Sequence, residues 1–175
     1  MSASKPKPPR PVLTARAIVL HQGHVLLLRA EEPGRTYFFL PGGGAHHDET
    51  LADTAKREVF EETGVRVIVE RPLYLREFIA PRHKRLTRDM PPDRHVLGLI
   101  FLCRPDPAVH GAKAPSAIGS FPGAVDGTQG VTGIEWMKLN DLAQVEITPP
   151  HIKRVLLGDF PPPPERGIEF WPDVD

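Results

Sequence analysis

Three apolar runs separated by short turns open the chain. They cover residues 12–20, 25–29 and 36–40, and each has the length and apolar content of a β-strand. Residues 21–24 read His-Gln-Gly-His and form a turn, so we predict that the first two runs make a hairpin. The third run leads into the glycine-rich segment 41–44, which we expect to be a loop.

The spacing of apolar residues changes to a helical period after residue 50. The positions that share one helical face are Leu51, Ala52, Ala55 and Val59. Thr50 and Asp53 have the spacing of a capping box in outline, and Gly64 is a natural helix stop. We therefore predict a helix that begins near residues 48–50, ends before Gly64 and packs its apolar face on the core.

The second half of the chain alternates predicted strands with segments rich in proline. Strands are expected at 65–79, with a break at Pro72, at 95–103 and at 134–137, and helical turns at 139–143 and 149–157. The stretch 104–130 is rich in proline, glycine and alanine and is long for a structureless loop, so we interpret it as an insertion that is mobile without ligand. This order of elements predicts a mixed sheet flanked by helices.

Composition separates one domain from two tails. Residues 1–11 are rich in serine, lysine and proline, and we expect them to be disordered. Residues 12–157 have the length and apolar content of a single domain. Residues 158–175 form a proline-rich tail that we expect to be extended. Trp171 in this tail either docks on the domain or a partner or stays exposed.

Charge and cysteine content narrow the class of protein. The 22 basic and 22 acidic residues give zero net charge, which argues against stable nucleic-acid binding or binding to a membrane surface. No apolar run approaches the ~18 residues of a membrane span, and no apolar leader opens the chain. Cys103 is the single cysteine and fits a buried position in a reducing compartment. We therefore expect a soluble, cytoplasmic protein.

Three carboxylates fall on one turn at the end of the predicted helix. Glu58, Glu61 and Glu62 are at positions i, i+3 and i+4, which lie on one helical face. They repel one another, and the negative end of the helix dipole opposes all three. Arg57 is the one cation nearby in sequence that offsets this charge. A bound divalent cation would offset it as well, and hard oxygen ligands suit Mg²⁺ or Mn²⁺.

The segment 43–65 resembles a family signature, the Nudix box, written G-x5-E-x7-R-E-U-x-E-E-x-G-U with U an aliphatic residue. Its fixed positions correspond here to Gly43, Glu49, Arg57, Glu58, Glu61, Glu62 and Gly64, and its aliphatic positions to Val59 and Val65. The preceding segment 37–44, Tyr-Phe-Phe-Leu-Pro-Gly-Gly-Gly, is also typical of the family. The resemblance covers about 12–157 and implies an α/β fold, an α/β/α sandwich around a mixed central sheet.

The resemblance also implies an activity and roles for the motif. It implies metal-dependent hydrolysis of a diphosphate bond in a nucleoside diphosphate linked to another group, or in a nucleoside triphosphate. Glu58, Glu61, Glu62 and the carbonyl of Gly42 would hold Mg²⁺ or Mn²⁺. Arg57 would orient a glutamate, and Glu49 would assist the metal or the water. The general base remains open between Glu61, Glu62 and a later carboxylate, for which the candidates are Glu77, Asp93, Asp126 and Glu135.

Substrate contacts are predicted from the basic residues and the glycines. Gly42 and Gly43 let the backbone approach a ligand closely. A basic loop, defined as Arg82, His83, Lys84, Arg85 and Arg88, either gathers substrate phosphates, with Arg82 and Arg85 as the candidates, or is simply solvated. Arg29 ends a predicted strand and has the same two interpretations. The alternative function is a non-catalytic nucleotide-binding regulatory domain, and whether the chain forms a homodimer is left open.

Overall fold

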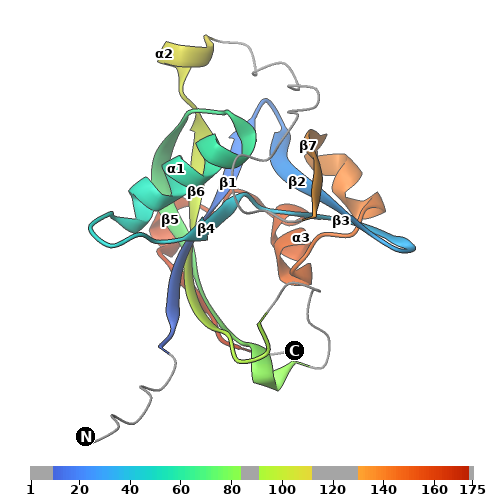
Figure 1. Cartoon of the computed structure of the whole chain (residues 1–175). Helices are drawn as coiled ribbons and strands as arrows, with labels where there is room; N and C mark the ends of the chain where they lie inside the picture. The colour runs from blue at the N-terminus through green and yellow to red at the C-terminus, as the bar shows by residue number, and fades with distance from the viewer. Residues whose placement is uncertain (1–9, 84–90, 112–129, 174–175) are drawn as a thin grey trace, which may run out of the picture.

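The computed structural model describes residues 10–83, 91–111 and 130–173. These residues form an eight-stranded mixed sheet with helices packed on its faces (Figure 1). The strands are β1 (Val12–His21), β2 (His24–Glu32), β3 (Arg35–Phe39), β4 (Gly42–Gly44), β5 (Val67–Ile79), β6 (His95–Pro105), β7 (Val131–Lys138) and β8 (Glu169–Trp171). The α-helices are α1 (Leu51–Thr63), α2 (Pro107–His110) and α3 (Pro150–Leu156), and the 3₁₀ turns are η1 (Ala80–Arg82), η2 (Leu139–Gln144) and η3 (Pro164–Arg166). The predicted α/β class is confirmed.

The sheet mixes parallel and antiparallel pairs, and its main order is β3-β2-β1-β6-β5-β8. Strand β1 runs parallel to β6, and β6 runs antiparallel to β5. The predicted hairpin is present, but β1 pairs with β2 only near the turn, at Leu20 and His21. Further back along β1, the partner of residues 14–16 is β4. The glycine segment that was predicted to be a loop is therefore a short strand of the sheet.

Helices α1 and α3 cover different faces of β1, because successive side chains of a strand point to opposite faces (Figure 1). Ala15, Ala17 and Val19 belong to the apolar cluster that contains Ala55 and Val59 of α1. Ile18 belongs instead to the cluster that contains Ile152 and Leu156 of α3. The alanines on the α1 side allow the helix to approach the sheet closely, and the predicted apolar face of α1 is the buried one.

Strand β5 continues through Pro72, where the sequence predicted a break. The register against β6 shifts between Val69 and Arg71 and again between Pro72 and Tyr74. Such irregularities are where a strand accommodates a proline, which lacks the N–H needed for a regular ladder. The prediction was wrong because a proline at a bulge interrupts hydrogen bonding without ending the strand.

The C-terminal tail adds a further strand at the edge of the sheet. Strand β8 pairs in parallel with β5, so that Trp171 lies opposite Arg76. The Trp171 ring stacks on Tyr74 with ring centroids 3.9 Å apart. Asp173 then accepts a hydrogen bond from the backbone N–H of Ile79 at 2.9 Å. Of the alternatives left open for Trp171, the structure shows docking on the domain.

Several expectations concern residues outside the described ranges. Residues 1–9, 84–90, 112–129 and 174–175 are not described, so the expected disorder of the N-terminal segment and most of the 104–130 insertion stay predictions. Cys103 is fully buried, as expected. No helix in the described part of the chain is long and apolar enough to cross a membrane.

Candidate active site on helix α1

Both ends of α1 are fixed by residues that the sequence predicted. The Thr50 hydroxyl accepts a hydrogen bond from the backbone N–H of Asp53 at 3.1 Å and donates one to the Asp53 carboxylate at 2.7 Å. Gly64 adopts a left-handed conformation with φ of 70°, and its N–H donates to the carbonyl of Phe60. A residue with a side chain would be strained at this C-cap position. These caps fix the positions at which the carboxylates of the last turns leave the helix.

Arg57 joins the carboxylates on one side of the site. Its Nη1 donates to Glu58 at 2.8 Å and to Glu61 at 2.9 Å. Its Nη2 donates to Glu49 at 2.7 Å and to the carbonyl of Gly44 at 3.0 Å. The sequence predicted the contact with Glu61 from its i, i+4 spacing. The structure adds Glu58, Glu49 and the β4 backbone, so one guanidinium ties the helix to the segment before it.

Glu49 is the most fully satisfied carboxylate of the group. It accepts hydrogen bonds from Arg57, from the backbone N–H of His46 at 2.8 Å and from the Thr54 hydroxyl at 3.0 Å. The hydrogen bonds from Arg57 are the main reason that the pKa of Glu49 falls to about 2, while partial burial opposes this shift. In return, Glu49 raises the pKa of Arg57 further above its usual range. Glu49 therefore remains ionised and anchors Arg57.

Glu62 lies in a contrasting environment. Its carboxylate accepts a hydrogen bond from the backbone N–H of Gly42 at 2.7 Å and makes no ion pair within the described residues. Burial raises the pKa of Glu62 to about 7, although the Gly42 N–H and the charge of Arg16 favour the ionised form. The negative charges of Glu58 and Glu61 add to the upward shift. Near neutral pH, this carboxylate is therefore divided between its protonated and ionised forms.

Close packing requires glycine at position 42, just before the box, and at position 43, its first residue. A side chain on Gly43 would place its Cβ 2.6 Å from the Glu58 carboxylate. A Cβ on Gly42 would lie 2.3 Å from the carbonyl oxygen of Ala15, and the φ of Gly42 is 139°. The sequence predicted close approach to a ligand, whereas the contacts observed are with α1 and β1. Any approach of a substrate to these glycines stays a prediction.

The donor chemistry of this turn fits a hard divalent cation. Glu58, Glu61 and Glu62 supply carboxylate oxygens, and Gly42 has its N–H bonded to Glu62. With Arg57 holding two of these carboxylates, no group of three or more acidic, histidine or cysteine side chains in the described ranges converges into a preformed cage. The turn thus has suitable ligand types, and the carboxylates would have to rotate to share one ion.

A comparison with known domain families supports this interpretation of the box. The model of the NUDIX domain matches residues 11–157, which is more than half of the chain. The chain belongs to the NUDIX domain family. Helix α1 is therefore its Nudix helix, and the box residues described above occupy the positions at which the family pattern places them.

Relatives of known sequence and structure agree with this assignment. A MutT-like protein of Streptomyces ambofaciens is 31% identical over 110 residues, which cover 63% of this chain and 62% of that protein. Phosphatase NudJ of Escherichia coli (strain K12) is 31% identical over 72 residues, which cover 41% of this chain and 47% of that protein. The chain thus spans less than two thirds of the length of either relative.

A solved structure confirms the fold. A NUDIX hydrolase from Nitrosomonas europaea has a TM-score of 0.61, with 95% of this chain and 82% of that chain covered. The two chains are 17% identical, so the similarity concerns the fold alone.

Arg16 is a charged residue near the Nudix helix that the sequence analysis missed. It lies opposite Gly42 in the β1–β4 register, and its Nη1 donates to the carbonyl of Leu40 at 2.7 Å. Burial lowers the pKa of Arg16, while the charges of Glu62 and Glu58 act in the opposite direction. An arginine inside an otherwise apolar strand was the signal available in the sequence.

The arginines that were predicted to bind substrate have acidic partners of their own. Arg29 lies 3.6 Å from Glu31 and 3.6 Å from Glu135. Arg82 lies 3.7 Å from Asp173 in the tail. These pairs account for the charges of Arg29 and Arg82 without a substrate. Arg85 falls outside the described ranges, as do Lys84 and Arg88 of the basic loop, so its role stays a prediction.

The later carboxylates considered as general base lie in different settings. Glu77 is 3.0 Å from the Nε2 atom of His95, and Glu135 pairs with Arg29. Asp93 is exposed, and Asp126 lies outside the described ranges. The structure therefore brings none of the described three into the hydrogen-bonded group around Arg57.

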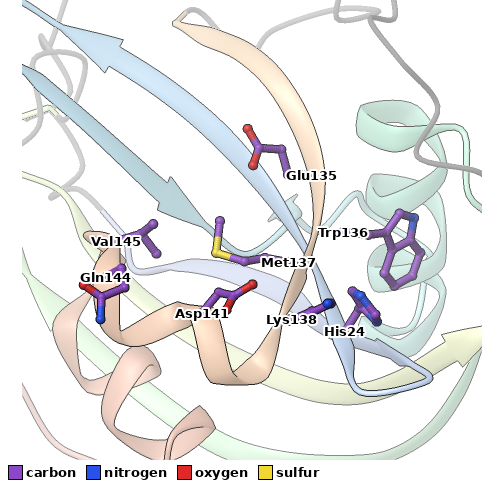
Figure 2. Close-up of a pocket in the computed structure, with 8 residues that line it drawn as sticks. All are labelled: His24, Glu135, Trp136, Met137, Lys138, Asp141, Gln144 and Val145. Carbon is purple, nitrogen blue, oxygen red and sulfur yellow. The ribbon is translucent and has the colours of Figure 1, made fainter.

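A separate open pocket of about 510 Å³ lies between β7 and η2 (Figure 2). Figure 2 shows the side chains that line it, which are His24, Glu135, Trp136, Met137, Lys138, Asp141, Gln144 and Val145. None of the carboxylates of the Nudix helix is among them. The chemistry of the box and this pocket therefore belong to different parts of the molecule.

Proposed function

We propose that the chain hydrolyses a phosphoanhydride bond in a nucleoside diphosphate linked to another group, with nucleoside triphosphates as the nearest variant. The observation that carries the proposal is the complete set of box carboxylates, on α1 and in the segment just before it, which lie in two different electrostatic environments. Arg57 forms ion pairs with Glu49, Glu58 and Glu61, whereas Glu62 is desolvated and has no cationic partner within 4 Å in the described residues. The family and its relative named as a phosphatase support a hydrolytic role.

A divalent cation fits this site by its ligand chemistry. Glu58, Glu61, Glu62 and the carbonyl of Gly42 would hold it, because they offer hard oxygen donors from one helical turn and the adjoining strand. When bound, the ion would supply neutralisation of the phosphate charge and polarisation of the phosphoryl group. Mg²⁺ and Mn²⁺ both suit these donors.

The residues of the chain itself supply positioning and a proton acceptor. Glu49 anchors Arg57, and Arg57 fixes Glu58 and Glu61 relative to β4 through the carbonyl of Gly44. Of the two box carboxylates considered as general base, Glu61 is ion-paired with Arg57 and Glu62 is not. The absence of a cation within 4 Å in the described residues favours Glu62 over Glu61 as the group that accepts the proton of the attacking water.

The test is turnover of a substrate panel with Mg²⁺ or Mn²⁺. The panel contains nucleoside diphosphate sugars, dinucleoside polyphosphates and nucleoside triphosphates, and the readout is release of phosphate-containing products. We expect metal-dependent turnover of at least one class, lost in excess EDTA and in Glu61→Gln. Binding of these nucleotides without turnover in either metal would instead establish the alternative, a regulatory nucleotide-binding domain.

A further inference from the structure

Two arginines on the sheet face that carries α3 have no acidic partner at ion-pair distance. Arg16 on β1 alternates with Ile18, and Arg76 on β5 alternates with Tyr74, and both of these neighbours belong to the cluster packed against α3. Within the described residues, neither arginine forms an ion pair, as is also true of the half-buried Arg71 and Arg94, whereas Arg29, Arg35, Arg57, Arg82 and Arg104 do. Both side chains are half-buried. Such cations usually have a carboxylate or an anionic ligand nearby.

The other contacts of the two guanidinium groups do not neutralise them. Arg16 donates to the carbonyl of Leu40, and Arg76 lies over the Phe78 ring at 5.0 Å. Burial lowers the pKa of Arg76 to about 10, and the positive charge of Arg16 lowers it further. Asp173 acts on Arg76 from a distance: its Oδ1 atom is engaged by Ile79 and His83, and its buried Oδ2 atom has no hydrogen-bond partner among the described residues. Glu62 and Glu58 act on Arg16 as Asp173 acts on Arg76, but none of them forms an ion pair with either arginine within the described residues, so both cations lack a direct acidic partner.

The strand register connects these arginines to the Nudix helix. Gly42 pairs with Arg16, Arg16 with Ile100, and Ile100 with Tyr74. With neighbouring strands about 4.8 Å apart, this row crosses about 14 Å of the sheet from the segment held by Glu62. Arg76 occupies the next row, opposite Gly98 of β6. Because Gly98 has no side chain, nothing at that position separates Arg76 from β1. The face that carries the two arginines thus begins beside the segment held by Glu62 and extends across β1, β6 and β5.

His151 faces the same region from the first turn of α3. Its ring meets Trp171 edge-on with centroids 4.7 Å apart, and Trp171 stacks on Tyr74 and pairs with Arg76 in the β5–β8 register. Its Nε2 atom is buried and has no hydrogen-bond partner in the described structure. Burial, with Arg76 and Arg154, lowers the pKa of His151 to about 4, so its ring is neutral at pH 7. A neutral imidazole can donate one N–H to an anion.

We propose that Arg16, Arg76 and His151 form a phosphate-binding subsite for the part of the substrate that the carboxylates of α1 do not engage. This inference rests on the proposed function. It assigns the substrate to the class that carries phosphate charge both at the carboxylates of α1 and at the arginines of the subsite. Strand β8 completes the subsite, because Trp171 packs against His151 and lies beside Arg76. The subsite thus uses the C-terminal tail, beyond the residues that match the family model.

The direct test is calorimetric titration of the whole chain with inorganic pyrophosphate in excess EDTA, which removes any contribution of a metal ion. We expect the wild-type chain to bind pyrophosphate. Arg16→Gln and Arg76→Gln should each raise the dissociation constant by at least about tenfold, as for loss of a charge-assisted contact. Arg104→Gln is the matched control, because Arg104 lies on β6 and pairs with Glu70 at 3.1 Å. Trp171→Ala should weaken binding, and Trp171→Phe should retain most of it.

Equal affinity in the wild-type, Arg16→Gln and Arg76→Gln chains would overturn the subsite, as would absence of binding by the wild type. Unchanged thermal unfolding of each variant shows that a loss of affinity is not a loss of fold. The outcome is independent of turnover, since no metal is present. If the substrate panel shows no hydrolysis while pyrophosphate binding depends on Arg16 and Arg76, the proposed function fails and the subsite stands. If the panel shows hydrolysis but pyrophosphate binding does not depend on Arg16 and Arg76, the proposed function stands and the subsite fails.

Discussion

Glu49 and Glu62 lie at the two ends of the Nudix motif and differ in nearly every physical respect. Glu49 accepts hydrogen bonds from a guanidinium, a backbone N–H and a hydroxyl, and its pKa is about 2. Glu62 accepts a backbone N–H, has no cation at ion-pair distance in the described structure, and has a pKa of about 7. Two glutamates of one motif therefore have different roles. The Glu49 carboxylate fixes the position of Arg57, and the Glu62 carboxylate lacks a paired cation in the described structure.

The difference explains why a single arginine suffices for a motif with four glutamates. Arg57 contacts Glu58 and Glu61 on the helix and Glu49 before it, which reduces the repulsion among these three charges. It does not contact Glu62 at ion-pair distance. Complete neutralisation would leave the site little electrostatic gain from binding a cation. The uncompensated carboxylate is therefore the feature that most directly supports metal binding.

The largest expected effect comes from removing a charge that contacts the reacting groups. Glu61→Gln should lower kcat by at least ~10²-fold, the low end for loss of a catalytic group, because the amide is a poor metal ligand and a poor base. Circular dichroism should show an unchanged fold. Steady-state kinetics with the best substrate of the panel measures the effect. Full activity of this variant, or of the wild type in excess EDTA, would remove α1 from the mechanism.

Loss of the positioning residue should have the next largest effect. In Arg57→Ala, Glu58 and Glu61 lose the guanidinium that orients them, and we expect kcat to fall roughly 10–100-fold, the range for groups that orient metal ligands. KM should rise less than kcat falls. Arg66→Ala is a matched control, because Arg66 lies over the Phe60 ring at 4.4 Å and does not contact the carboxylates. A rise in KM alone would mean that Arg57 binds substrate directly.

Gly43 offers a sharper test of local geometry. In Gly43→Ala, the added Cβ would lie 2.6 Å from the Glu58 carboxylate, so this flexible side chain must move. We expect a clear loss of kcat, of several-fold or more by analogy with other positioning contacts, and little change in the melting temperature. Gly44→Ala is the control, since a Cβ there meets no atom within 4 Å. Equal kinetics for the two variants would show that the position of Glu58 is unimportant.

Stability should respond to Glu62 in the opposite direction from activity. Because folding raises its pKa from 4.5 to about 7, the folded state binds more protons and loses stability as the pH rises through that interval. In metal-free buffer at pH 8, Glu62→Gln should therefore raise the melting temperature by a few degrees, from about 1–3 kcal/mol of relieved charge burial. Below pH 4.5 the two proteins should melt alike. A destabilised variant at pH 8 would contradict the raised pKa.

The sequence predicted the Nudix helix, its caps and its carboxylates because all of them depend on local spacing. The Arg57 contact to Glu61 follows from the same helical geometry, whereas the contact to the adjacent Glu58 was not predicted and that to Gly44 depends on the path of the preceding segment. Strand β4 and the continuation of β5 through Pro72 depend on pairing with distant strands. Arg16 and Trp171 share one face only because β1, β6, β5 and β8 align in a particular register. No local pattern encodes that register.

The most direct test of the contrast between Glu49 and Glu62 is a carbon-13 NMR titration of the side-chain carboxyl groups, first without metal and then with saturating Mg²⁺. We predict that Glu62 titrates near pH 7 without metal, that Glu49 stays ionised down to about pH 2, and that Mg²⁺ moves the Glu62 titration to lower pH while leaving Glu49 unchanged. Titration of Glu62 near its ordinary value of 4.5, with no response to Mg²⁺, would contradict the account.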